Sequence, residues 1–137
     1  MADVLNVFMR WLHLASVATL IGGMLYASLV VTRAAGALSK EAAETLSEAA
    51  ASRFRPIVWT TVATLALSGV YNLLTTPGHS ALYRVILAVK LLLVLHVFSA
   101  AILAMRPHNS RRTRQMTGAF LSGLIIIAIS AYLRRIF

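Results

Sequence analysis

The chain has 137 residues, of which 59% are hydrophobic and 12% are charged, and its formal net charge is +9. A soluble domain of this size carries roughly 25% charged residues, so the composition argues against an ordinary water-soluble fold. The sequence contains no cysteine, which excludes disulfides, thiolate metal sites, iron–sulfur clusters and covalently attached haem.

Four long apolar segments predict four transmembrane helices in a single domain that covers residues 1–137. We expect spans at about residues 11–32, 56–74, 85–105 and 116–133. Each is close to the 20 or so residues that an α-helix needs to cross a hydrocarbon core of about 30 Å. The predicted fold class is therefore an all-α integral membrane protein, built as an antiparallel bundle of four transmembrane helices.

The loop between the first two spans, residues 33–55, is the only long one, and it predicts a short amphipathic helix at Ser39–Ala51. Ser39 suits the N-cap position. The side chains of Glu41, Glu44 and Glu48 share one face, which we expect to be solvated. Pro56 suits the first position of the second span, because its missing N–H would be unpaired there in any case.

The two later loops are short. Pro77-Gly78 in the second loop predicts a turn, and the third loop is a basic turn at Arg106–Arg114. The histidines in these two loops, His79 and His108, are expected to face solvent.

The distribution of lysine and arginine predicts the orientation. The side that carries loops 33–55 and 106–115 has eight such residues: Arg33, Lys40, Arg53, Arg55, Arg106, Arg111, Arg112 and Arg114. The opposite side has four: Arg10, Arg84, Arg134 and Arg135. Cytoplasmic loops carry the excess of such residues, so both loops are predicted to be cytoplasmic and both termini outside. We attribute the net positive charge to residues that flank the spans and bind anionic lipid headgroups, rather than to nucleic-acid binding.

Small residues at helical spacing predict close contacts between helices, or with a second copy or another membrane protein. They are Ala15, Thr19, Gly23 and Ala27 in the first span, and Gly118 with Ser122 and Ala119 with Gly123 in the fourth. The second span carries a polar stripe of Thr61, Thr64, Ser68 and Asn72. The stripe is expected to face the bundle interior, although its hydroxyls could instead bond to their own helix backbone.

Few ionisable side chains lie within the spans, and such residues are functional candidates because they are costly in a membrane. His13, Asn72 and Lys90 fall within one or two turns of the same end of the bundle at about 1.5 Å rise per residue. We predict that they form one site. The alternatives are that Lys90 extends to the headgroups and that His13 is an interfacial histidine without a ligand.

His96 lies near the centre of the third span and needs either a ligand or a hydrogen-bond partner such as Thr64, Ser99 or a neighbouring carbonyl. If the first span starts at Trp11, His13 and His96 differ in depth by nine residues, or about 13 Å. That difference disfavours a haem held by both histidines, but a helix that starts near Val4 would weaken the objection. A haem b held by one histidine meets no such difficulty.

Copper is the other predicted ligand. Met9 precedes His13 by four residues, so a thioether and an imidazole share one helical face. This pairing suits Cu(I), and Met24 could extend the set.

Several short motifs resemble a known family. They are Arg10-Trp11-Leu12-His13 followed by Gly22-Gly23, Ser68-Gly69-Val70-Tyr71-Asn72, and Lys90-Leu91-Leu92. Together they resemble the copper resistance protein D-like family of four-helix membrane proteins, which is related to the bacterial membrane protoporphyrinogen oxidases. The resemblance implies a bacterial inner-membrane location and a functional pair of His13 and Lys90. Its oxidase branch implies haem b and a porphyrinogen substrate.

One departure from the oxidase pattern concerns the end of the third span. The oxidases have a tyrosine-histidine pair there, whereas this chain has Ala100-Ala101. Three functions therefore follow from the sequence. The first is a haem- or metal-binding membrane protein with His13 as a ligand and Lys90 against an anionic group. The second is transport of copper across the inner membrane. The third is a ligand-free structural or interaction subunit of a membrane complex.

Overall fold

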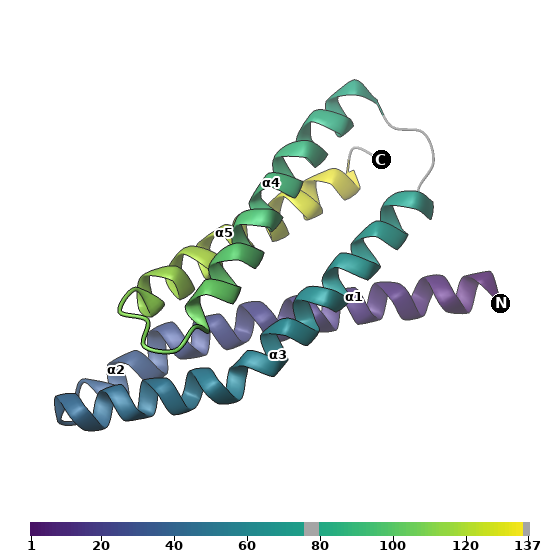
Figure 1. Ribbon diagram of the computed structural model, residues 1–137. Coiled ribbons are helices and arrows are strands. Elements are labelled where there is room, and N and C mark those ends of the chain that lie inside the picture. The colour runs from purple at the N-terminus through teal and green to yellow at the C-terminus, as the bar shows by residue number, and fades with distance from the viewer. Residues whose placement is uncertain (76–79, 136–137) are drawn as a thin grey trace.

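The computed structural model describes residues 1–75 and 80–135, and this part of the chain is helical and contains no strand (Figure 1). Helix α1 (Ala2–Leu25) continues through a π-helical turn, η1 (Tyr26–Val31), into the short helix α2 (Thr32–Ala35). Helices α3 (Lys40–Thr75), α4 (Ala81–Ala104) and α5 (Arg112–Arg135) follow. The predicted turn at Pro77-Gly78 and the predicted solvent-facing His79 lie outside the described residues.

Four helical segments in the described part are long and apolar enough to cross a membrane: Ala2–Ala35, Lys40–Thr75, Ala81–Ala104 and Arg112–Arg135. The number and order of apolar helices therefore agree with the sequence prediction. Two of the four are much longer than a membrane crossing needs, since 34 and 36 residues correspond to about 50 Å of helix.

The first loop differs from its prediction, because the expected short helix is not separate from the second span. Ser39 does cap a helix, and its Oγ accepts a hydrogen bond from the Ala42 N–H at 3.3 Å. That helix then continues through Pro56 to Thr75. Proline inside a helix leaves the carbonyl four residues earlier without its usual N–H donor, which a bend can accommodate. In Figure 1, α3 changes direction between its two halves.

The helices pack as two antiparallel pairs. Helix α4 packs most extensively against α5, and α1 packs against α3, while α1 and α5 join the two pairs. Helices α3 and α4 touch each other much less. The buried core takes side chains from every long helix, among them Leu20, Met24, Val58, Leu65, Val97, Ala101, Met116 and Ala119.

Two glycines mark close approaches between helices. A methyl group at Gly23 of α1 would collide with the Phe54 ring of α3, and one at Gly123 of α5 would collide with the Ile21 side chain of α1. The predicted contacts are therefore confirmed at these two positions. At Gly118, by contrast, an added Cβ would meet nothing within 4 Å.

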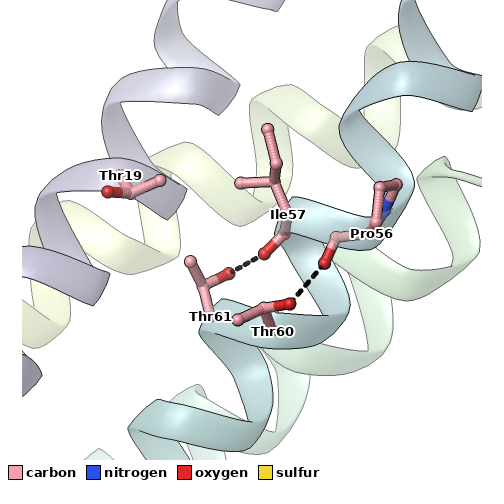
Figure 2. A pocket seen from close by; sticks show the side chains of 5 residues that line it. All are labelled: Thr19, Pro56, Ile57, Thr60 and Thr61. Atoms are coloured by element: carbon pink, nitrogen blue, oxygen red, sulfur yellow. Dashed lines mark hydrogen bonds between the residues drawn. The ribbon is translucent and has the colours of Figure 1, made fainter.

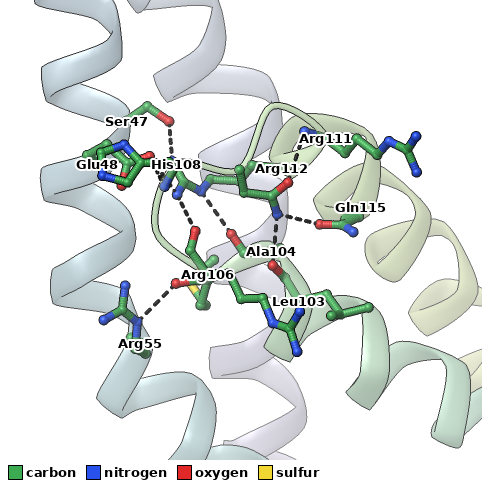
Figure 3. Close-up of polar contacts among 12 residues, drawn as sticks. Ser47, Glu48, Arg55, Leu103, Ala104, Arg106, His108, Arg111, Arg112 and Gln115 are labelled. Carbon is green, nitrogen blue, oxygen red and sulfur yellow. Dashed lines mark hydrogen bonds and ion pairs between the residues drawn. The ribbon is translucent and has the colours of Figure 1, made fainter.

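A buried arginine joins the α4–α5 loop to α3 (Figure 3). Arg112 is only 5% exposed, and its Nε donates to the Ala104 carbonyl at 2.8 Å. Its Nη1 donates to Ser47 Oγ at 2.8 Å, and its Nη2 donates to Glu48 Oε1 at 3.0 Å and to the Arg106 carbonyl at 2.8 Å. Arg112 thus satisfies carbonyls at the end of α4, which have no partner within their own helix.

Glu48 completes this network, which corrects the expectation that its carboxylate is merely solvated. The same Oε1 also accepts a hydrogen bond from the backbone N–H of His108 at 3.1 Å. Nearby, Arg55 Nε donates to the Met105 carbonyl at 2.9 Å. The network therefore ties α3 to the α4–α5 loop at the end of the bundle where α4 ends and α5 begins.

Arg112→Ala should destabilise the protein by roughly 2–3 kcal/mol, the cost of losing hydrogen bonds to a charged group and leaving buried carbonyls unpaired. Arg111→Ala is the matched control, because Arg111 is exposed and its hydrogen bonds, to Asn109 and Gln115, use its backbone N–H and carbonyl rather than its guanidinium. Thermal unfolding of both variants in the same detergent checks the difference. Equal melting temperatures would show that the network adds no stability.

Candidate functional site

Two side-chain hydrogen bonds set the register between α1 and α3. The Tyr71 hydroxyl donates to Asn6 Oδ1 at 2.8 Å, and His13 Nδ1 lies 2.7 Å from Ser68 Oγ. Both bonds lie toward the end of the bundle at which α3 ends and α4 begins. We call this the His13 end.

This register defines which part of α1 lies beside the apolar half of α3. Further along α1, Gly23 lies beside Phe54, just before the apolar half of α3 begins at Pro56. The part of α1 beside that half therefore runs from about Asn6 to Gly23. The predicted span, 11–32, lies within the apolar helical run Ala2–Ala35, and its bounds stay a prediction. His13 lies about two helical turns inside this stretch of α1, counted from Asn6.

His13 is held at one ring nitrogen. The ring is half-buried between α1 and α3, and Ser68 Oγ is the hydrogen-bond partner of its Nδ1. A Cβ added to Gly69 would lie 4.0 Å from His13 Cε1, so the ring rests against a backbone position that carries no side chain. Within the described residues, Nε2 has no hydrogen-bond partner.

Lys90 and Arg134 bring positive charge to the same end. Lys90 is half-buried on α4, and its charge interacts with His13 on α1 and with Arg134 at the end of α5. The one ion pair among the described residues is Arg112–Glu48, at the opposite end of the bundle. Neither Lys90 nor Arg134 therefore has a carboxylate partner in the part of the chain that the structure describes.

The structure thus brings His13 of α1 beside Ser68 of α3, while Lys90 of α4 interacts electrostatically with His13 and with Arg134 of α5. His13 and Lys90 were predicted together. Ser68 was predicted as part of the polar stripe and of a family motif, and Arg134 as a flanking arginine, but neither was assigned to the site. The spacing of His13 and Ser68 from one end of the bundle is a signal that could have paired them. Asn72, the third predicted member, is half-buried one turn beyond Ser68 on α3.

His96 is placed elsewhere. Its side chain is exposed on α4, whereas the adjacent Val97 is buried in the core. The hydroxyl of Ser99, one of its predicted partners, donates instead to the Leu95 carbonyl at 2.8 Å. No hydrogen bond joins His96 to another residue in the described ranges, and the structure does not bring it to His13.

The three predicted copper ligands are only partly together. Met9 is half-buried one turn before His13 on α1. Met24 is fully buried in the core, eleven residues after His13, which is about 16 Å along the helix. Met24 and His13 therefore cannot bind the same ion. Among residues 1–75 and 80–135, no three side chains of His, Asp or Glu gather in a metal-binding cluster.

The polar stripe of α3 is largely satisfied by its own helix. Thr61 and Ser68 are buried, and Thr61 Oγ1 donates to the Ile57 carbonyl at 2.9 Å. Ser68 Oγ likewise donates to the Thr64 carbonyl at 2.7 Å. Thr61 and Ser68 therefore face inward, and their hydroxyls also bond to backbone carbonyls of α3. Both interpretations of the stripe, an inward-facing surface and self-bonded hydroxyls, apply at these two positions.

A shallow, almost wholly apolar depression of about 360 Å³ lies between α1 and α3 (Figure 2). Its lining residues are Thr19, Pro56, Ile57, Thr60 and Thr61. All three threonine hydroxyls donate to carbonyls of their own helix. The depression offers no uncommitted hydroxyl hydrogen, and it is not the site formed by His13.

Comparison with known proteins finds no matching family model, no matching curated protein and no matching solved structure. This chain's own residues are therefore the basis for inferring its function.

Proposed function

We propose that this chain is an integral membrane protein that binds a ligand through Nε2 of His13, and that the ligand is haem b. The observation that carries the proposal is the hydrogen bond between His13 Nδ1 and Ser68 Oγ at 2.7 Å. It holds the imidazole at one nitrogen and leaves the other available. Histidines that bind metals usually have this arrangement, with the second ring nitrogen bonded to an oxygen acceptor.

The surrounding residues fit haem. A b-type haem has anionic propionates, and Lys90 and Arg134 supply two cations that have no carboxylate partner in the described chain. A Cβ at Gly69 would lie 4.0 Å from His13 Cε1, an ordinary van der Waals distance, so Gly69 lies close to the ring. The interiors of four-helix bundles commonly hold such groups. When bound, haem would supply one-electron redox chemistry, while His13 would hold the iron and the two cations would orient the propionates.

Copper is the second candidate, and the position of Met9 favours it. A thioether and an imidazole one turn apart suit Cu(I). Transport of copper across the membrane would need further sites, and Met24 supplies a thioether about 16 Å deeper along the same helix. The resemblance to the copper resistance protein D-like family supports either ligand. A ligand-free structural subunit is the outcome if neither ligand binds.

We place the protein in a bacterial inner membrane, with loops 33–55 and 106–115 in the cytoplasm. Four helices of sufficient length and hydropathy support the membrane location. The eight lysines and arginines on the loop side, against four on the other, support the orientation. On this arrangement the His13 end faces the outside of the cell.

The orientation can be tested with introduced cysteines, because the native chain has none. Ser110→Cys lies in the predicted cytoplasmic loop, and Ser80→Cys lies at the start of α4 on the opposite side. A membrane-impermeant thiol reagent applied to intact cells should label position 80 and leave position 110 unlabelled. The reverse pattern would invert the topology.

The ligand assignment predicts that His13→Ala abolishes haem binding, while His108→Ala, in the loop at the opposite end, leaves it unchanged. Lys90→Gln should weaken haem binding about tenfold, since one propionate contact to a cation is worth roughly 1.5 kcal/mol. Absorption titrations of the detergent-purified variants with haemin measure both effects. Equal haem affinity in His13→Ala and the unaltered protein would remove His13 from the site.

A further inference from the structure

We infer that Ser68 is a positioning residue that selects the tautomer of His13 with hydrogen on Nδ1 and a lone pair on Nε2. The inference rests on the proposed function, because the choice between the two tautomers matters only if His13 binds a ligand. The tautomer itself follows from the geometry around one buried hydroxyl.

The Ser68 hydroxyl has one hydrogen and two close polar neighbours. Its Oγ lies 2.7 Å from the Thr64 carbonyl oxygen and 2.7 Å from His13 Nδ1. A carbonyl oxygen cannot donate, so two oxygens at 2.7 Å require the serine hydrogen between them. The Leu65 carbonyl, at 3.3 Å, shares that hydrogen weakly. Ser68 Oγ has no hydrogen left for His13 and must act as the acceptor.

The donor in the His13–Ser68 bond is therefore Nδ1–H. A neutral imidazole carries one hydrogen, so Nε2 bears a lone pair and is the nitrogen that can bind a metal. If Nε2 held the hydrogen instead, Nδ1 and Ser68 Oγ would face each other at 2.7 Å without a hydrogen between them. Ser68 thus disfavours the tautomer that could not bind.

The burial of Ser68 strengthens the preference for the Nδ1–H tautomer of His13. Ser68 is fully buried, so water cannot replace His13 as the partner of its Oγ. The bond to the Thr64 carbonyl fixes the side-chain rotamer of Ser68 within α3. In addition, the Asn6–Tyr71 hydrogen bond holds α1 and α3 together about two helical turns from His13 along α1. Ser68 Oγ is therefore already positioned to accept the hydrogen bond from His13 in the ligand-free protein.

The tautomer can be read directly from ¹⁵N NMR of the ligand-free protein labelled at histidine, with His13→Gln used to assign the His13 signals. In the unaltered protein, His13 Nδ1 should show the signal of a protonated nitrogen and Nε2 that of an unprotonated one. In Ser68→Ala the pattern should become a mixture or reverse. Ser130→Ala is the matched control, because Ser130 donates to a carbonyl of its own helix in the same way but has no histidine partner.

The loaded protein gives a second readout. Loss of the oxygen partner of a metal-binding histidine typically lowers ligand affinity by about 10–100-fold, and Ser68→Ala should show that loss for haemin while Ser130→Ala does not. The haem reduction potential should also rise in Ser68→Ala, because the histidine becomes a weaker electron donor.

The outcomes separate the two claims. A protonated Nε2 on His13 in the unaltered protein overturns the inference whatever binds. An unchanged His13 pattern in Ser68→Ala overturns it too. If the Nδ1–H pattern is present and depends on Ser68, but no variant binds haemin or Cu(I), the selection of the tautomer stands and the proposed function fails.

Discussion

The hydrogen bond between His13 and Ser68 is the contact that positions the candidate site. It contributes to the register between α1 and α3, and it pairs one ring nitrogen of His13, which lies between the two helices, with a buried hydroxyl. Lys90 then reaches the same end from α4 and Arg134 from α5. Lys90 thus brings positive charge to the end of the bundle at which His13 Nε2 has no hydrogen-bond partner within the described residues.

A different set of polar contacts, centred on Arg112, stabilises the opposite end of the bundle. There the buried guanidinium of Arg112 bonds to three helix or loop positions and to Glu48, and so holds the α4–α5 loop against α3. In a membrane-spanning bundle, as proposed for this chain, apolar contacts between helices contribute little specificity, since lipid tails are as apolar as leucine. Polar contacts near the two ends, together with the close approaches at Gly23 and Gly123, therefore do much to define which helices meet and in what register.

Sequence patterning predicted the helical class and the four apolar helices, because runs of apolar residues report length and hydropathy directly. Hydropathy does not choose a membrane window within the 34-residue apolar run of Ala2–Ala35, whereas the contacts of Asn6 and His13 define which part of α1 lies beside α3. Sequence patterning separated the loop helix from α3, because Pro56 is as acceptable at a helix start as within a bend. His13 and Lys90 were predicted as one site from their depth, whereas Ser68 needed the register to be known. His96 was expected to need a partner and instead lies exposed on α4.

The most direct test of the central claim is cross-linking of paired cysteines between α1 and α3, which the cysteine-free chain allows without background. With a short bifunctional thiol reagent, Asn6→Cys combined with Tyr71→Cys should cross-link rapidly in membranes. Arg10→Cys combined with Tyr71→Cys, one turn further along the same face of α1, should not. That result would place His13 beside Ser68. Preferential cross-linking of the Arg10 pair would shift α1 by a turn, separate His13 from Ser68 and contradict the account.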